Sequence, residues 1–184
     1  MAKHSGAVAK SYAKALFELA RERNHVDAVG KELEDVAALM VQQPELVAFL
    51  SRPWVAATAK RGAVAEMAAR LGVSPLTRDF LALIATRNRA EHLSAIAAAY
   101  RALDDDAHGR ARVKLRSAIA LTDAERASLS ARLSRMLQGR TLVIEDSVDP
   151  RLLGGFVAEV GSMILDGSLD TQLDRMRDRL ARAQ

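Results

Sequence analysis

The chain has 184 residues, 49% hydrophobic content, no cysteine and a formal net charge of +4. This length and composition are typical of one large or two small globular domains, and they exclude a disordered chain, disulfides and thiolate metal sites. The basic excess is evenly divided, with 14 basic and 12 acidic residues up to Asp105 and 13 and 11 after it, whereas a nucleic-acid-binding protein usually concentrates its charge in one patch.

Residues 1–105 are predicted to form a six-helix, all-α bundle, because their apolar residues recur with helical periodicity and are interrupted by glycine, proline and polar residues. We expect helices at Ser5–Arg23, Val26–Gln42, Pro44–Ser51, Ala56–Leu71, Pro75–Asn88 and Ala90–Leu103. The second helix should bury Val29, Leu33, Val36 and Met40. The beginning of the chain has no long apolar run, so we expect neither a secretory signal nor a membrane span.

The first and fifth helices are apolar over more of their circumference than a helix needs to face one core. In the first helix the apolar arc is roughly 200° wide. In the fifth helix the expected core face is Leu76, Phe80, Leu83 and Ile84, whereas Leu81 and Ala85 extend beyond it and Thr77 interrupts the arc. Alanines beside larger side chains would form a shallow groove for an external amphipathic helix; the alternative is that both helices are simply central in the bundle. The candidate partner-binding residues are Tyr12, Ala13, Leu16, Phe17, Ala20, Leu81 and Ala85.

An acidic stretch, Asp104–Gly109, predicts a solvated connection between two domains. We place these domains at 1–105 and 110–184, with residues 106–109 as the linker. After it the periodicity changes from helical to alternating. Arg110–Arg116 predicts a strand with one apolar and one basic face.

The rest of the second half predicts a small α+β domain. Thr122 and Glu125 have the spacing of a capping box and begin a helix that ends at Gly139. Thr141–Glu145 is the next expected strand, and the residues after Asp149 supply two more strands and a final helix. The overall prediction is therefore an α+β fold, with the helical bundle followed by this domain.

The stretch from Asp149 to Leu180 is the most distinctive part of the sequence. It contains an Asp-Pro turn, and Gly154 and Gly155 allow a sharp turn or a close backbone approach before a short strand. It contains no nucleophile-base pair and no phosphate-binding loop. We expect its acids to cap turns and helix ends. Since the four histidines are scattered, we expect no metal site, no cofactor and no catalytic residue.

This stretch resembles the C-terminal signature of the delta subunit of F-type ATP synthases, a family that includes the mitochondrial oligomycin-sensitivity-conferring protein. The signature residues here are Asp149, Gly154, Gly155, Gly161 and Asp166, and the resemblance covers nearly the whole chain. Two positions depart from it: Ala158 replaces a larger aliphatic residue, and Glu159 stands where a basic residue is common.

The resemblance implies a non-catalytic stator subunit, present as a single copy and bound to the bacterial inner membrane on its cytoplasmic side only through partners. In this family the groove between the first and fifth helices is expected to hold the N-terminal helix of an alpha subunit. The C-terminal domain is expected to bind the b subunits of the peripheral stalk. The alternative is a basic nucleic-acid-binding module, suggested by the pI of about 9.8 and by the basic strand.

Overall fold

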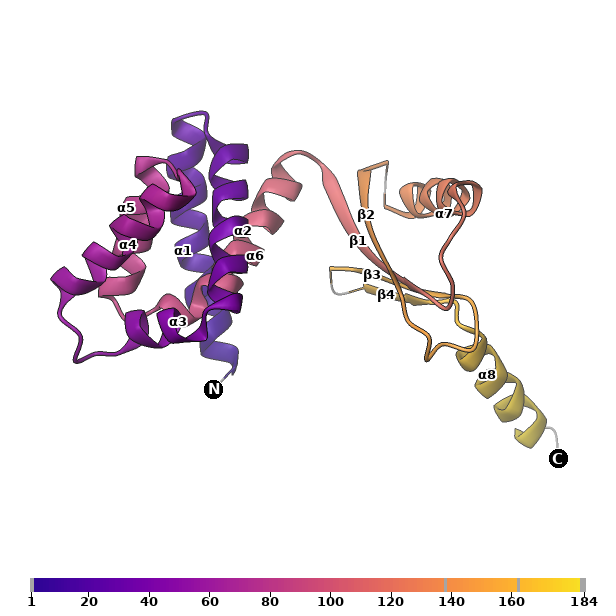
Figure 1. The fold of residues 1–184 in the computed structure, drawn as a ribbon. Coiled ribbons are helices and arrows are strands. Elements are labelled where there is room, and N and C mark those ends of the chain that lie inside the picture. The colour runs from indigo at the N-terminus through magenta and orange to yellow at the C-terminus, as the bar shows by residue number, and fades with distance from the viewer. Residues whose placement is uncertain (1, 138, 162, 183–184) are drawn as a thin grey trace. The chain divides into compact units, whose positions relative to one another are not determined.

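A computed structural model describes the backbone of residues 2–137, 139–161 and 163–182, and the side chains of 6–137, 139–161 and 163–177 (Figure 1). The chain divides into two compact units, Met1–Asp104 and Asp105–Gln184. The first is helical, and the second is built on a four-stranded sheet. The fold is therefore α+β, as predicted. None of the described helices is both long enough and apolar enough to cross a membrane.

The helices of the first unit begin and end close to the residues that interrupt the apolar periodicity. They are α1 (Ala2–Glu22), α2 (Val26–Gln42), α3 (Pro44–Ser51), α4 (Ala57–Leu71), α5 (Pro75–Thr86), the short 3-10 helix η1 (Ala90–His92) and α6 (Leu93–Ala107). Gly72 ends α4 in the left-handed conformation, with φ of 66°. Ser74 caps α5, where its hydroxyl accepts the Thr77 amide at 3.4 Å. The same Ser74 donates its amide and hydroxyl to Glu32 of α2, at 2.9 and 2.8 Å.

Tyr100 and Lys60 are among the polar side chains that are buried with a partner in the first unit. The Tyr100 hydroxyl donates to the Val26 carbonyl at 3.0 Å, and the ring packs edge-on against Phe17. Burial raises the pKa of Tyr100 well above its ordinary value, and the nearby Asp104 carboxylate adds to the rise. Lys60 is 1% exposed and donates to the side-chain carbonyl of Asn88. Such pairing offsets the cost of removing polar groups from water.

The second unit contains one parallel and two antiparallel strand pairs. Its elements are β1 (Arg110–Ser117), α7 (Asp123–Met136), β2 (Thr141–Val148), β3 (Phe156–Val160), β4 (Met163–Asp166) and α8 (Leu169–Arg182). The strand order is β2-β1-β3-β4, with β1 parallel to β2 and antiparallel to β3. A parallel pair needs a crossover connection, and α7 supplies it, lying on one side of the sheet (Figure 1).

The predicted capping box begins α7. The Thr122 hydroxyl accepts the Glu125 amide at 3.3 Å, and the Glu125 carboxylate accepts the Thr122 amide at 2.9 Å. Hydrogen bonds from Thr122 lower the pKa of Glu125. Leu133 of α7 packs on the buried strand residues Val113, Leu115 and Ala158. Ala158, the smaller residue at the first departure from the signature, is completely buried there.

Candidate functional site

Most of the predicted partner-binding residues lie inside the first unit. Ala13, Leu16, Phe17, Ala20, Leu81 and Ala85 are at most 8% exposed and belong to its hydrophobic core. Tyr12 is half-buried, and its ring centroid lies 6.4 Å from that of Phe80. These side chains therefore hold α1 and α5 in the unit, and Tyr12 is the member of the set that also reaches the surface.

The inward face of α5 differs from the expected one. Leu81 and Ala85 are buried, at 3% and 1% exposure, whereas Leu83 is 45% exposed. The predicted core face was wrong at Leu83 because Thr77 was treated as an interruption. In the structure Thr77 is completely buried, and its hydroxyl lies 3.2 Å from that of Ser74. A threonine with a satisfied hydroxyl can occupy a core position.

Apolar side chains beside the buried set remain partly exposed on the same two helices. On α1, Leu19 is 44% exposed and Val8 and Tyr12 are half-buried. On α5, Leu83 is exposed and Leu76 is half-buried. Residues 8, 12 and 19 share one side of a helix because they are spaced by multiples of about one turn. We call the residues Val8, Tyr12, Leu19, Leu76 and Leu83 the α1–α5 strip.

The two helices of the α1–α5 strip are neighbours. Tyr12 contacts Phe80 near the middle of both helices. Arg23, just after α1, and Leu76, at the start of α5, line the same small pocket of about 190 Å³. The end of α1 therefore lies near the start of α5, and the helices run antiparallel. Sequence periodicity had identified α1 and α5 as helices that are apolar over a wide arc. It had not shown which edge of that arc is buried and which is exposed.

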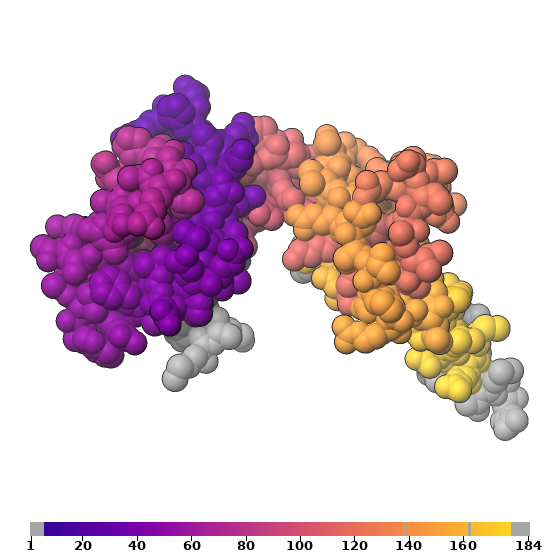
Figure 2. All heavy atoms as spheres, in the orientation of Figure 1, coloured from indigo at the N-terminus to yellow at the C-terminus, as the bar shows by residue number. Residues whose placement is uncertain are grey.

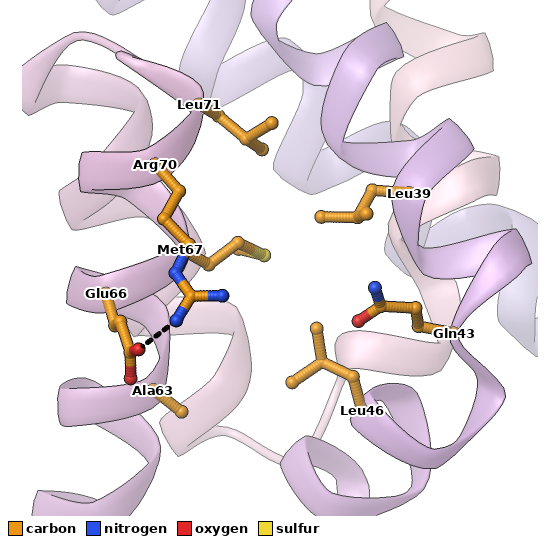
Figure 3. A pocket seen from close by; sticks show the side chains of 8 residues that line it. All are labelled: Leu39, Gln43, Leu46, Ala63, Glu66, Met67, Arg70 and Leu71. Atoms are coloured by element: carbon orange, nitrogen blue, oxygen red, sulfur yellow. Dashed lines mark hydrogen bonds and ion pairs between the residues drawn. The ribbon is translucent and has the colours of Figure 1, made fainter.

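A second apolar hollow lies between α2, α3 and α4 (Figure 3). It has a volume of about 310 Å³ and is lined by Leu39, Gln43, Leu46, Ala63, Glu66, Met67, Arg70 and Leu71. Arg70 and Glu66 form an ion pair at 2.6 Å on one wall. Beyond this pair the lining carries no titratable group, so it offers no acid-base chemistry. The sequence analysis did not predict this hollow.

The acidic stretch before β1 is more ordered than expected. Helix α6 continues through Asp104–Asp106 to Ala107, where a solvated linker had been predicted. Asp105 is 6% exposed, and its carboxylate accepts Arg112 at 2.9 Å and Arg110 at 3.2 Å. Arg112 also pairs with Glu145 of β2 at 2.7 Å. The hydrogen bond to Asp105 is the main cause that raises the pKa of Arg112.

The basic face of β1 is largely neutralised by acids of its own unit. Besides the pairs of Arg110 and Arg112, Arg116 lies 3.0 Å from Glu159 of β3 and 3.7 Å from Asp149. Lys114 is opposite Glu145 on one side and Glu159 on the other. Glu159, the second departure from the signature, thus faces this basic row. Phosphate binding requires cations that are not already compensated, so this face does not support nucleic-acid binding.

Gly154 and Gly155 allow the loop before β3 to lie against the start of α8. A Cβ atom at Gly154 would be 2.6 Å from Cδ1 of Leu169. Gly155 has φ of 80°, and a Cβ there would be 2.3 Å from the carbonyl oxygen of Gly167. The Leu169 amide also donates to the Gly154 carbonyl at 2.9 Å. The paired glycines are therefore explained by close backbone packing.

The two signature aspartates stabilise turns beside these glycines. Asp149 accepts the Arg151 amide at 3.1 Å, and this bond is the main cause that lowers its pKa. Asp166 accepts the Ser168 amide and the Thr171 hydroxyl, both at 2.9 Å. Hydrogen bonds from Ser168 and then Thr171 lower the pKa of Asp166. Both groups are held as carboxylates, which suits capping and not proton donation.

The signature thus forms an anchor for α8. Gly154, Gly155 and Asp166 surround its first turn, and Asp149 is tied to the neighbouring β1 through its amide, which donates to Ser117 at 2.9 Å. Gly161 is separate, since it adopts φ of 59° at the end of β3. Beyond the anchor, α8 leads away from the sheet (Figure 1), and its atoms, in yellow, lie on the visible surface (Figure 2).

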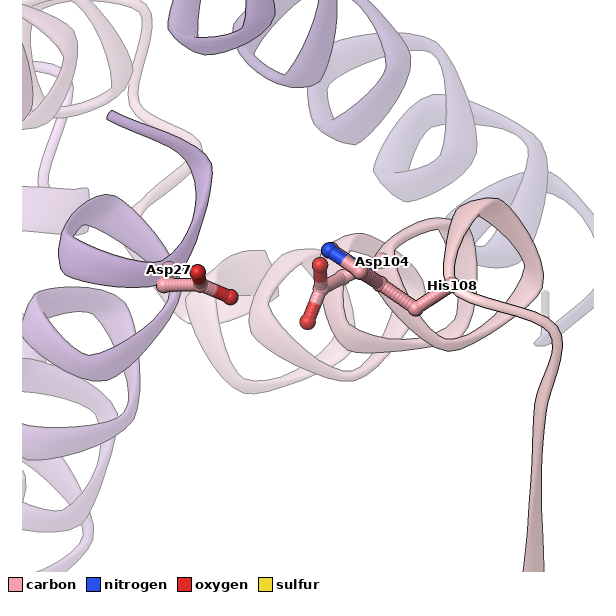
Figure 4. A group of neighbouring side chains, drawn as sticks. All are labelled: Asp27, Asp104 and His108. Carbon is pink, nitrogen blue, oxygen red and sulfur yellow. The ribbon is translucent and has the colours of Figure 1, made fainter. Parts of the chain in front are cut away.

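Three side chains near the end of α6 form a group that the sequence did not predict. Asp27 of α2, Asp104 and His108 each offer one ligand atom, and these atoms lie within 4.8 Å of one another (Figure 4). Asp104 and His108 are four residues apart, so the helical turn alone brings them together. Asp27 and His108 are exposed. The sequence analysis did not anticipate that His108 lies beside two carboxylates. The side chain of His4 lies outside the described residues.

A family model and several named relatives match this chain. A family model for the ATP synthase delta (OSCP) subunit matches residues 8–180. A protein named ATP synthase subunit delta from Anaeromyxobacter sp. (strain Fw109-5) is 39% identical, over 95% of this chain and 97% of its own. Proteins of the same name from Solidesulfovibrio magneticus and Symbiobacterium thermophilum are 34% and 36% identical, covering 96% and 97% of this chain and 97% and 95% of their own.

The fold has a counterpart among solved structures. A chain of the mitochondrial ATP synthase hexamer from Toxoplasma gondii superposes on this one with a TM-score of 0.70. The alignment covers 94% of this chain and 97% of that one, at 22% sequence identity. At this identity the likeness concerns the fold alone.

Proposed function

Because the chain belongs to the ATP synthase delta (OSCP) subunit family, whose members are non-catalytic subunits, we propose that it ties the catalytic head of a bacterial ATP synthase to the peripheral stalk. The observation that carries the proposal is the division into two compact units, each with partly exposed apolar side chains on a helix. Two docking surfaces on one chain raise the effective concentration at each end, so the connection persists even when either contact is modest.

The first unit, as a six-helix bundle, binds the N-terminal helices of alpha subunits along α1 and α5. The predicted residues Ala13, Leu16, Phe17, Ala20, Leu81 and Ala85 position these helices from inside the core. The α1–α5 strip, with Tyr12 common to both sets, makes the contact. Each large apolar side chain newly buried there contributes about 1.5–3 kcal/mol before the costs of association.

The second unit binds the b subunits, and one copy of the chain serves each complex. The chain then lies on the cytoplasmic side of the inner membrane and is held there by its partners. In this arrangement the chain resists the counter-torque on the head while the proton gradient drives rotation. No cofactor or metal takes part, and the ion pairs on the β1 face leave the nucleic-acid alternative without a supporting observation.

Binding of the full chain to a synthetic peptide of the alpha-subunit N-terminus tests the first contact. Leu19→Asp and Leu83→Asp place a charge on the α1–α5 strip, at positions 44% and 45% exposed, where folding is tolerant of the change. We expect each to weaken binding by about tenfold or more, since a desolvated charge would lie in an apolar contact. Lys10→Asp, on the opposite side of α1 and exposed, is the matched control and should bind as the parent does. If both leucine variants keep the circular dichroism spectrum of the parent chain and bind the peptide with unchanged affinity, the proposal is contradicted.

A further inference from the structure

The group formed by Asp27, Asp104 and His108 combines two kinds of metal ligand. Its three ligand atoms are one imidazole nitrogen and two carboxylate oxygens, and all lie within 4.8 Å of one another. In Figure 4 the carboxylate of Asp27 points from α2 toward Asp104 and His108. The scattered histidines predicted no metal site, but folding brings one of them beside two carboxylates. We call these three residues the α2–α6 group.

The packing of α2 against α6 positions this group. Asp104 lies in the last turns of α6, and His108 follows directly after the helix ends at Ala107. One turn before Asp104, the Tyr100 hydroxyl donates to the carbonyl of Val26, the residue before Asp27, at 3.0 Å. This hydrogen bond holds the start of α2 beside the end of α6. The carboxylate from α2 is therefore placed by packed helices and not by a long loop.

The two carboxylates of the α2–α6 group repel each other. Asp27 makes no ion pair or hydrogen bond with any side chain in the described part of the chain. Burial is the main cause that raises the pKa of Tyr100, and the charges of Asp104 and Asp27 raise it further. Both negative charges therefore act on the same small region. A cation bound between the carboxylates would offset their repulsion.

The ligand atoms of the α2–α6 group favour zinc over magnesium or calcium. Imidazole is a good ligand for zinc, whereas magnesium and calcium take oxygen ligands. With bond lengths of about 2.0–2.2 Å, the ligand atoms of a tetrahedral zinc site lie about 3.3 Å apart. The present separations, up to 4.8 Å, must therefore shorten. Asp27 and His108 are exposed, so their side chains can rotate to close this difference.

We propose that the α2–α6 group binds one zinc ion through a nitrogen of His108 and one carboxylate oxygen each from Asp27 and Asp104. Water supplies the fourth ligand, as it does in zinc sites with three protein ligands. The ion links the first turn of α2 to the end of α6 and stabilises the first unit. The stator function proposed above requires no metal, so this inference goes beyond it.

Calorimetric titration of the full chain, without a histidine tag, with zinc chloride tests the site. We expect the parent to bind one zinc ion in the α2–α6 group. His108→Ala should weaken this binding at least tenfold, since even the loss of a group that only supports a ligand costs about 10–100-fold. Asp27→Asn should also weaken it. The matched controls are His25→Ala and Asp35→Asn, at exposed residues on or beside α2 that lie outside the group, and they should bind zinc as the parent does.

Thermal unfolding followed by near-ultraviolet circular dichroism provides a second measurement. All tyrosines and the tryptophan precede Asp105, so this signal reports on the first unit. Saturating zinc should raise the melting temperature of the parent and of both controls but not of His108→Ala, because a ligand that binds only the folded state stabilises it.

Three results would overturn the inference. The first is a parent chain that does not bind zinc. The second is zinc binding by His108→Ala or Asp27→Asn that is as tight as that of the parent. The third is binding of magnesium chloride as tightly as zinc chloride, because the carboxylates alone would then account for the affinity.

Discussion

The two units bury their apolar side chains to different extents. The core of the first unit draws buried residues from α1, α2, α3, α4, α5, η1 and α6, whereas the buried core cluster of the second is Val113, Leu115, Leu133 and Ala158. Among described side chains, large exposed apolar residues are five in the first unit and nine in the smaller second one. The first unit can therefore be stable by itself, whereas the stability of the second depends more on what covers its exposed apolar residues.

The largest expected effect comes from removing a core side chain from the second unit. Leu115→Ala leaves a cavity in the small sheet core and should cost about 2–5 kcal/mol, enough to unfold that unit. The two tyrosines and the tryptophan all precede Asp105, so near-ultraviolet circular dichroism should keep its native signal. Hydrogen exchange should show loss of protection in β1 and β3.

The matched change in the first unit is Leu33→Ala, at a residue that is also completely buried. Its cost should be of the same order, but the larger core should keep the unit folded. Loss of the tyrosine signal in Leu115→Ala, or unfolding of both units together, would contradict the difference in self-sufficiency.

The next effect distinguishes two glycines of the second unit. Gly155→Ala combines a left-handed φ of 80° with a Cβ that would be 2.3 Å from a backbone oxygen, so it should cost about 2–4 kcal/mol. Gly161→Ala, at φ of 59° with open space around it, should cost about 1 kcal/mol. Urea denaturation followed by far-ultraviolet circular dichroism measures both. Equal costs would mean that contact with the start of α8 contributes nothing.

Local periodicity was sufficient where one face of an element is buried and the other is polar. In α2, Val29, Leu33, Val36 and Met40 were predicted to face inward, and all are at most 5% exposed. In α1 and α5 the apolar arc is too wide for this argument, because its middle and its edges have the same composition. Only the packing of Thr77 and Leu81 against the other helices decides which edge is buried.

Long-range contacts account for the other differences. Asp105 was expected in solvent, because its neighbours in the sequence are acidic and the arginines that bury it follow in the next element. The role of Gly154 depends on Leu169, fifteen residues later, so the sequence predicts a close approach but not its partner. The spacing of Leu169, Leu173 and Met176 predicts one face of a helix, yet their exposure depends on how the loop before β3 directs α8.

A smaller effect is expected from the ion pairs that join α6 to β1. Asp105→Asn removes the charge while keeping most of the shape, and the amide can satisfy the guanidinium groups of Arg110 and Arg112 only in part. We expect a loss of about 1–3 kcal/mol. Glu34→Gln changes a half-exposed partner of Arg101 and should cost less than about 1 kcal/mol. The melting temperatures of both variants, measured by thermal unfolding, test this difference. Equal melting temperatures would show that the buried pairs of Asp105 contribute no more to stability than the surface pair of Glu34.

The smallest expected effect is a pH dependence confined to the second unit. The pKa values of Asp149 and Asp166 are lowered in the folded chain, so the folded state binds their protons less readily than the unfolded state does. Their contribution to stability is therefore complete above the unfolded pKa of about 4 and is lost as the pH falls through the lower folded values. Hydrogen exchange at decreasing pH should show that α8 and the loop before β3 lose protection before α2 does. Asp166→Asn should flatten this dependence, because it removes the titrating group while retaining an acceptor for Ser168. If the variant keeps the full pH dependence, the anchor of α8 is not held by the charge of Asp166.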